Sequence, residues 1–379
     1  MLSCAAFASA LALRLCDPML PALAAEFQIS LGRAALVVTA AGVAYGCCQL
    51  LFGPLGDRHG KFRVLAWACL ASTIGAAGSA LSDSFATLAL ARVCTGATTA
   101  ALIPLSMAWI GDNVGVRERQ ATLARFLSGQ VIGLLSGQVL GGFFADHFGW
   151  RWGFAVLAAI YLAVGLLLLR AMARRPHLGR SGESAGGRSR LRAVLALPAA
   201  RFVVTAVYFE AVAVFGALAF APAFLHHRFG LSLFHSGLAV GTFGLGGLSY
   251  TLLAPWWVRR LGPRRLAQSG SLLLALAFVT LVVAPVWPLG MAACALAGLG
   301  FYQLHNTLQT LATQMAPAAR GTAVSLFASF FFIGQASGAA LSGVLVDHVG
   351  AAALFWLAAL PLPLVGAAVA RHLRTGSPG

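Results

Sequence analysis

The chain alternates between long apolar stretches and short polar connections along its whole length. Each apolar stretch has roughly 20 residues, enough for a helix to cross about 30 Å of hydrocarbon. Gly and Pro occur inside the stretches, and membrane helices tolerate both. The pattern therefore predicts twelve membrane-spanning helices, over residues 3–25, 34–54, 62–81, 86–110, 123–144, 152–172, 199–224, 234–257, 266–285, 287–312, 321–344 and 351–370.

Composition excludes a water-soluble globule. Of the 379 residues, 59% are hydrophobic and 9% are charged, whereas a soluble domain carries about 25% charged residues. The first apolar stretch has no basic residues before it and continues past Asp17, so we interpret it as a first span and not as a signal peptide; a missing N-terminal stretch stays open. The seven cysteines lie within the predicted spans without metal-ligand spacing, so we expect no metal and no cofactor.

The net charge of +16 is distributed unevenly over the connections. Basic residues gather after the second, fourth and eighth spans and in the long connection 173–198, while the opposite connections carry only Arg33, Arg151 and Arg228. Because basic connections stay in the cytoplasm, both termini are expected there, in a bacterial inner membrane. The lipid bilayer explains the basic character, and no nucleic-acid partner is expected.

The second half of the chain repeats the first at a shift of 201 residues. Between Ile132 and Phe154, ten of 23 positions are identical to their counterparts between Ile333 and Phe355, including the pair Asp146 and Asp347. We therefore predict an N-terminal six-helix bundle over 1–172, a basic linker over 173–198 and a C-terminal six-helix bundle over 199–379. Two such parallel bundles are typical of transporters that expose a central site alternately to either side.

One polar connection has a specific pattern. The segment GPLGDRHGKFRVL places its glycines, acid and bases at fixed offsets. It resembles the cytoplasmic signature of the major facilitator superfamily, and the chain resembles in particular the twelve-span drug:proton antiporter group. Phe62 departs from the signature where a second basic residue is usual. The matching positions, with the acidic residue that closes the fourth span, are Gly53, Asp57, Arg58, Gly60, Lys61 and Asp112.

The resemblance implies roles for these residues. It implies that Asp57 engages the start of the eleventh span, which Gly321 opens here, so that the loop locks the outward-facing state, and that Asp112 is the acidic partner of the loop arginine. From the residues alone, Gly53 is expected to permit close helix approach and Gly60 a tight turn. The bases could also act only as determinants of topology.

Two further segments resemble motifs of the same family. Arg92 stands at the charged position of a fourth-span motif that the family ties to proton transfer. The glycine series Gly133, Gly137, Gly141 and Gly142 resembles the antiporter motif, but Gln138 replaces its proline. Small residues at this spacing predict close packing against another helix.

Ionisable residues inside the spans are the candidates for proton coupling or solute binding. A charge within a membrane is costly unless it has a partner or water, so such residues mark functional sites. Arg14 and Asp17 could also pair simply to reduce the cost of burial. The candidates are Asp17, Arg14, Arg92 and Glu210.

A polar stripe on the tenth span is expected to face a central cavity, with a shorter one on the second. Hydrogen bonding between helices explains such side chains equally well, and a lone histidine is commonly a packed residue. The cavity candidates are Tyr45, Gln49, Tyr302, His305, Asn306 and Gln309.

The prediction is a proton-coupled secondary transporter that exports a small organic solute by alternating access. Its expected partners are the solute, protons and the bilayer, and we expect a monomer. Uptake by symport on the same scaffold stays open, as does a non-transporting receptor or scaffold. An enzyme is not expected, since the sequence has no nucleophile motif, no phosphate-binding loop and no metal-ligand cluster.

Overall fold

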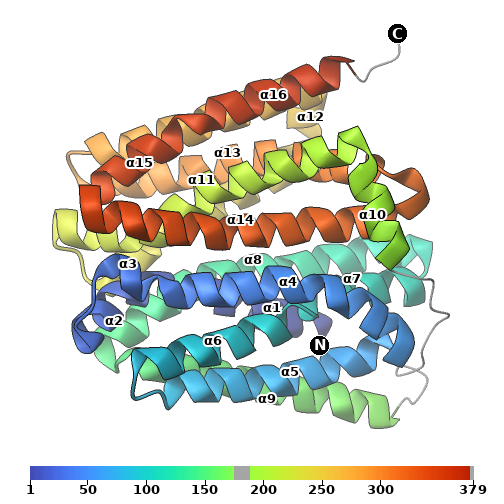
Figure 1. The fold of residues 1–379 in the computed structure, drawn as a ribbon, viewed down its shortest axis with the longest axis horizontal. Coiled ribbons are helices and arrows are strands. Elements are labelled where there is room, and N and C mark those ends of the chain that lie inside the picture. Colours follow the sequence, from blue (N-terminus) through green and yellow to red (C-terminus); the bar gives the residue numbers. More distant parts are fainter. Residues whose placement is uncertain (175–187, 376–379) are drawn as a thin grey trace.

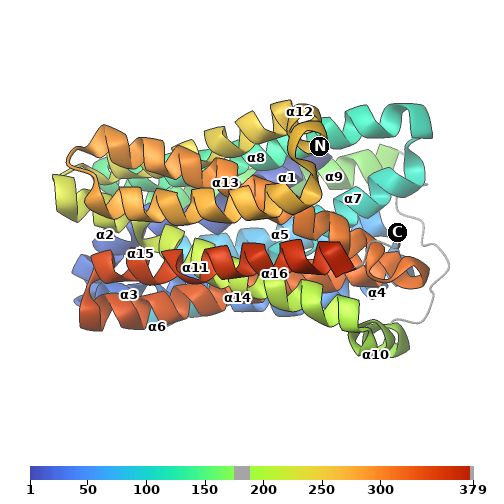
Figure 2. The same cartoon turned by 90° about the horizontal axis from the view of Figure 1, so that it is seen from above.

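A computed structural model describes residues 1–174 and 188–375, which are almost entirely helical and contain no strand (Figure 1). The helices run roughly parallel to one another, as the view from above also shows (Figure 2). The first-half helices are α1 (Leu2–Arg14), η1 (Asp17–Met19), α2 (Leu20–Phe27), α3 (Leu31–Ala34), α4 (Leu36–His59), α5 (Lys61–Ala80), α6 (Phe85–Thr99), α7 (Leu102–Asn113), α8 (Val116–His147) and α9 (Trp150–Arg174). The second-half helices are α10 (Arg188–Ala196), α11 (Pro198–Phe229), α12 (Leu233–Val283), α13 (Trp287–Gln314), η3 (Pro317–Ala319), α14 (Arg320–Val349), α15 (Ala351–Ala359) and α16 (Pro361–Thr375).

The predicted all-helical membrane fold is confirmed. Among the described residues, ten segments are long and apolar enough to cross a membrane. One of them, α12, has 51 residues and a non-helical break at Gly262 (φ 68°, ψ 166°), so it covers two predicted spans. The remaining predicted span is α13, which carries the polar stripe. The linker prediction falls partly on 175–187, outside the described residues; its last part forms α10.

Two helix pairs show the repeat in three dimensions. On α8, a Cβ atom added at Gly133 would lie 2.4 Å from the Phe7 carbonyl oxygen of α1. On α14, a Cβ atom added at Gly334 would lie 2.6 Å from the Tyr208 carbonyl oxygen of α11. Gly334 lies 201 residues after Gly133 in the chain, and Tyr208 lies 201 residues after Phe7. Equivalent helices therefore pack through equivalent glycines, as the sequence repeat predicted.

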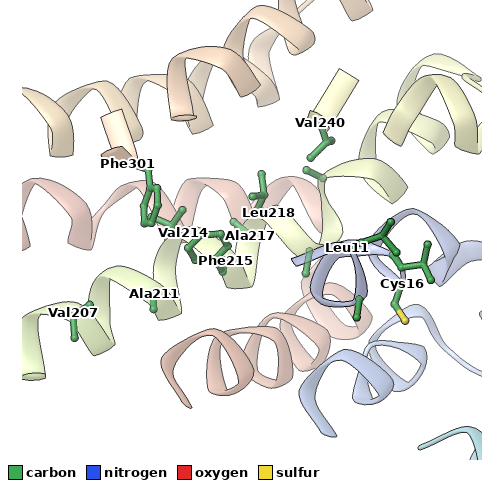
Figure 3. Packing of buried hydrophobic residues seen from close by; sticks show 14 of the residues in the cluster. Leu11, Cys16, Val207, Ala211, Val214, Phe215, Ala217, Leu218, Val240 and Phe301 are labelled. Atoms are coloured by element: carbon green, nitrogen blue, oxygen red, sulfur yellow. The ribbon is translucent and has the colours of Figure 1, made fainter. Parts of the chain in front are cut away.

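The two halves lie side by side, with α8 against α12 and α4 against α14 (Figure 1). A buried apolar cluster joins them and includes Leu11 and Cys16 of the first half and Phe215 and Phe301 of the second (Figure 3). Both views place α2 and α3 at one end of the bundle and α10 at the other (Figures 1 and 2). These are called the capped end and the linker end below.

Candidate solute cavity and its gates

A cavity of about 300 Å³ lies between the two halves. Arg14 of α1 and Gln138 of α8 border it from the first half, and residues of α11 to α14 border it from the second. Its aromatic wall consists of Phe215, Phe243, Phe301, Phe331 and Phe332. Aromatic and aliphatic walls with a few polar groups are typical of sites for small organic molecules.

The α13 stripe faces this cavity. Its lining includes Tyr302, His305, Asn306 and Gln309, all four of the residues expected there. The second-span candidates lie outside the lining. Tyr45 is 1% exposed and packs on Phe332 of α14 with ring centroids 4.1 Å apart, and Gln49 is 6% exposed. They are buried because α4 packs directly against α14.

Asp17 is completely buried at the start of η1, where the first span leaves regular α-helix before Pro18. Its Oδ2 atom lies 3.5 Å from Nη1 of Arg14 and accepts a hydrogen bond of 3.0 Å from Nε2 of Gln138. Nη2 of Arg14 donates to Oε1 of Gln335 on α14 at 2.7 Å. Arg14 therefore connects the buried carboxylate of one half to the other half.

Glu210 forms the second carboxylate pair. It is completely buried on α11, and its Oε2 atom lies 2.9 Å from Nδ1 of His305 on α13. The His305 ring stacks on Phe301 with centroids 4.7 Å apart. Neither Asp17 nor Glu210 belongs to the cavity lining, whereas their partners Arg14 and His305 do. A solute in the cavity would meet the basic partner of each pair.

Arg92 lies deeper in the first half and is 2% exposed. Its Nη2 atom donates to the Ala12 carbonyl oxygen at 3.2 Å, and its guanidinium lies 5.6 Å from the ring centroid of Phe154. Its Nε atom is buried without a hydrogen-bond partner. The side chain is thus held beside α1, but its charge is not paired with a carboxylate within the described residues.

The glycines of α8 hold α1 close to the cavity. Cβ atoms added at Gly133, Gly137 and Gly141 would each lie within 2.7 Å of a carbonyl oxygen of the first span. Gly142 faces the other way, toward Leu233 of α12. The predicted close packing is confirmed, and it sets the position of Arg14 and Asp17 relative to Gln138.

Two carboxylates join the halves at the capped end. Asp347, at the end of α14, accepts hydrogen bonds from Gly32 N at 2.9 Å and from Ser30 Oγ at 2.5 Å. Asp146, at the end of α8, accepts from Leu233 N at 3.1 Å and from Phe234 N at 2.6 Å. Asp146 with Leu233 and Asp347 with Gly32 are the same contact in the two repeats, with the halves exchanged. We call these contacts the carboxylate caps.

The linker end differs, because its carboxylates Asp57 and Asp112 pair within the first half. Lys61 lies 3.3 Å from Asp57 and 2.5 Å from Asp112, so Asp112 pairs with Lys61 and not with the exposed Arg58. Gly60 has φ 89° and permits the expected turn. A Cβ atom added at Gly53 or Gly321 would meet nothing within 4 Å.

At this end the expected close approach at Gly53 is wrong, and the contact expected of Asp57 in the outward-facing state is not formed in this conformation. Gly53 does not support a close helix approach, since its surroundings are open. Among the residues that the structure describes, Asp57 makes no hydrogen bond or ion pair with α14. Its charge is instead paired within the first half, through Lys61.

The Major Facilitator Superfamily model matches residues 2–323 and, in a second match, residues 236–378. The chain belongs to the Major Facilitator Superfamily. It is a multi-pass membrane protein of a transporter family, and the likeness to that superfamily predicted from its sequence is confirmed.

The chain also resembles curated transporters in sequence and a solved transporter structure in fold. The uncharacterized MFS-type transporter YceJ of Bacillus subtilis is 27% identical over 350 residues, covering 89% of this chain and 87% of YceJ. The multidrug export protein EmrB of Escherichia coli K12 is 29% identical over 174 residues, covering 46% of this chain and 34% of EmrB. The structure of a peptide transporter POT in complex with sulfate superposes with a TM-score of 0.77 at 17% identity, over 99% of this chain and 94% of that one.

Some cavity residues of this superfamily member were missed from the sequence. Gln138 was noted only as a departure from a motif, and that departure was the available signal for its bond to Asp17. Gln335 lies in the eleventh span among small and apolar residues, and no spacing pairs it with Arg14. The phenylalanines of the wall could not be distinguished from other buried aromatics, because burial in lipid and burial in a cavity leave the same pattern.

Proposed function

We propose that this protein is a proton-coupled secondary transporter that exports a small organic solute by alternating access. One observation carries the proposal: two fully buried carboxylates, Asp17 and Glu210, each pair with a basic side chain that lines the cavity. Removing a carboxylate from water is costly unless a proton or a cation neutralises it. Movement of Arg14 or His305 away from its carboxylate favours uptake of a proton by that carboxylate, and the return of the basic side chain favours release of the proton.

The direction, location and assembly are further parts of the proposal. Export is supported by the resemblance to drug:proton antiporters and by the similarity to EmrB, a multidrug export protein. The distribution of basic residues supports a bacterial inner membrane with both termini in the cytoplasm. With that orientation the cavity faces the cytoplasm, since the carboxylate caps close the other end. The assembly we propose is a monomer in the bilayer.

Uptake by symport is the second candidate. It is favoured by the position of Arg14, which lines the cavity and pairs with Asp17. A negatively charged solute bound to Arg14 would take the place of Asp17 as its partner. Asp17 would then be neutralised by a proton, so that solute and proton bind together. Co-binding of this kind drives both in the same direction, whereas export against protons requires that they exclude each other.

Glu210→Gln is expected to lower transport driven by a pH gradient by roughly tenfold, equivalent to about 1.4 kcal/mol. The amide keeps the shape and a hydrogen bond for His305 but cannot carry a proton. Solutes are first selected by thermal-shift screening of the purified protein and then measured in proteoliposomes with and without an imposed gradient. The sign of the gradient that accelerates solute entry distinguishes export from symport.

The matched control is Asp83→Asn, which removes an exposed carboxylate between α5 and α6. It should transport like the unmodified protein. Full gradient-driven transport by Glu210→Gln would remove Glu210 from the coupling mechanism, and solute movement that ignores the gradient in the unmodified protein would end the proposal of proton coupling.

A further inference from the structure

Buried charge near α1 does not balance. Arg14 is 6% exposed, Arg92 is 2% exposed and Asp17 is completely buried. Among the described residues, Asp17 is the one carboxylate that pairs with either arginine, because Glu210 lies with His305. Two buried guanidinium groups are thus accompanied by one carboxylate, which pairs with Arg14 and not with Arg92. An excess positive charge in such a place is costly unless an anion or water accompanies it.

A small cavity lies beside these groups. It has a volume of about 20 Å³ and is bordered by Arg14, Arg92 and Gln335, with apolar residues of α1, α4, α11 and α14 completing it. A volume of this size holds a water molecule or an ion of similar radius. No carboxylate belongs to its described lining. Arg14 and Gln335 border the large cavity as well, so the two cavities adjoin.

The polar atoms at this place are mostly donors. Nε of Arg92 is buried without an acceptor. The guanidinium groups of both arginines can only donate hydrogen bonds, because they have no acceptor atom. The amide oxygen of Gln335 already accepts from Arg14, which leaves its NH₂ group as a donor. Phe215 lies under Arg14 with its ring centroid 4.3 Å from the guanidinium carbon and holds it in place. Donors on planar guanidinium groups favour an anion over a cation or a neutral ligand.

We propose that Arg14, Arg92 and Gln335 form a binding site for a single negatively charged group. Two sources share this chemistry: a halide ion in the small cavity, and the carboxylate of an organic solute that enters from the large cavity. In either case the bound negative charge balances the positive charge that Asp17 leaves unpaired. The site is defined by equilibrium binding, and it therefore stands or falls separately from proton-coupled transport.

The halide arm titrates the purified full-length protein with sodium chloride and follows its melting temperature. Chloride should give a saturable rise of roughly 2 °C or more in the unmodified protein. Arg92→Gln should abolish the saturable part, while Arg201→Gln, which removes an exposed arginine of α11, should retain it. General salt effects act on both variants alike, so their difference reports the site.

The carboxylate arm compares benzoate with benzamide, which has the same shape and no charge. A rise with benzoate and none with benzamide, lost in Arg14→Gln, assigns the site to a solute carboxylate. A rise with chloride that depends on Arg92 assigns it to a halide. Equal responses of the unmodified protein and both cavity variants to chloride, together with equal responses to benzoate and benzamide, would overturn the proposal and leave a cavity that holds water.

If Arg92→Gln does not fold, Arg92→Lys replaces it. The lysine keeps the charge but lacks the planar pair of donors, so the chloride concentration at half-saturation should increase by roughly tenfold. An unchanged half-saturation point in this variant would also contradict a site built on Arg92. The comparison of benzoate with benzamide needs no variant and stays informative.

Discussion

Gly141→Ala is expected to destabilise the protein strongly. In an ordinary helix this change stabilises by about 1 kcal/mol, because alanine has the higher helix propensity. Here the added Cβ atom would lie 2.2 Å from the Leu15 carbonyl oxygen and 2.7 Å from Cγ of Pro18. The first span would have to move away from α8, and the hydrogen bond between Gln138 and Asp17 would stretch. Overpacking of this kind costs about 1–3 kcal/mol and sometimes more.

The matched control for this prediction is Gly111→Ala in α7, since a Cβ atom there would meet nothing within 4 Å. It should leave the melting temperature unchanged or raise it slightly, whereas Gly141→Ala should lower it by several degrees or prevent folding. The measurement is the melting temperature in detergent, with the yield of monodisperse protein as a second readout. Equal behaviour of the two variants would contradict the close contact between α8 and the first span.

Removing both carboxylate caps with Asp146→Ala and Asp347→Ala should loosen the capped end. A capping side chain contributes about 1 kcal/mol, so the two together contribute about 2 kcal/mol. Because these contacts join opposite halves, their loss should change the equilibrium between closed and open conformations of this end by about thirtyfold. The fold within each half should persist, since neither carboxylate is part of a bundle core.

A thiol-labelling experiment measures this change. Ala339→Cys introduces a thiol at a position where the native alanine is 1% exposed and borders the small cavity, in a background without the seven native cysteines. Its labelling rate should increase by about thirtyfold in the double variant, in proportion to the open population. Asp83→Ala, which removes an exposed carboxylate, is the control and should leave the rate unchanged. A double variant that labels at the control rate would show that the caps do not hold the halves together.

The repeat determined more of the structure than any single motif did. The identities at Gly133 and Gly334 predicted equivalent helix packing, and both glycines do lie on a carbonyl oxygen of the equivalent helix. The shared Asp146 and Asp347 were visible as a repeated pair, but their function was not. A sequence cannot show that each accepts hydrogen bonds from the opposite half, because the partners Leu233 and Gly32 differ in type and offer only backbone N–H groups.

Ion pairs within one helix could be predicted from the sequence, whereas ion pairs between distant helices could not. The pair of Arg14 and Asp17 was predicted because residues three apart on a helix are neighbours, and it is present at 3.5 Å. Glu210 and His305 were both named as candidates, yet nothing joined residues 95 positions apart in the chain. At the linker end, the family resemblance placed Asp57 against the eleventh span, and the structure places it beside Lys61.

The sequence by itself determined the membrane-spanning class, the twelve helices, the doubled architecture and the polar stripe of α13. These depend on the length and periodicity of apolar runs and on identities between the halves, all of which are local or repeated properties of the chain. Only the tertiary structure decided which polar groups meet, which end of the molecule is closed, and that one of two neighbouring buried arginines has no carboxylate partner among the described residues. Those features arise from contacts between distant helices, where the packing of the halves, and not the order of the residues, sets which charges come together.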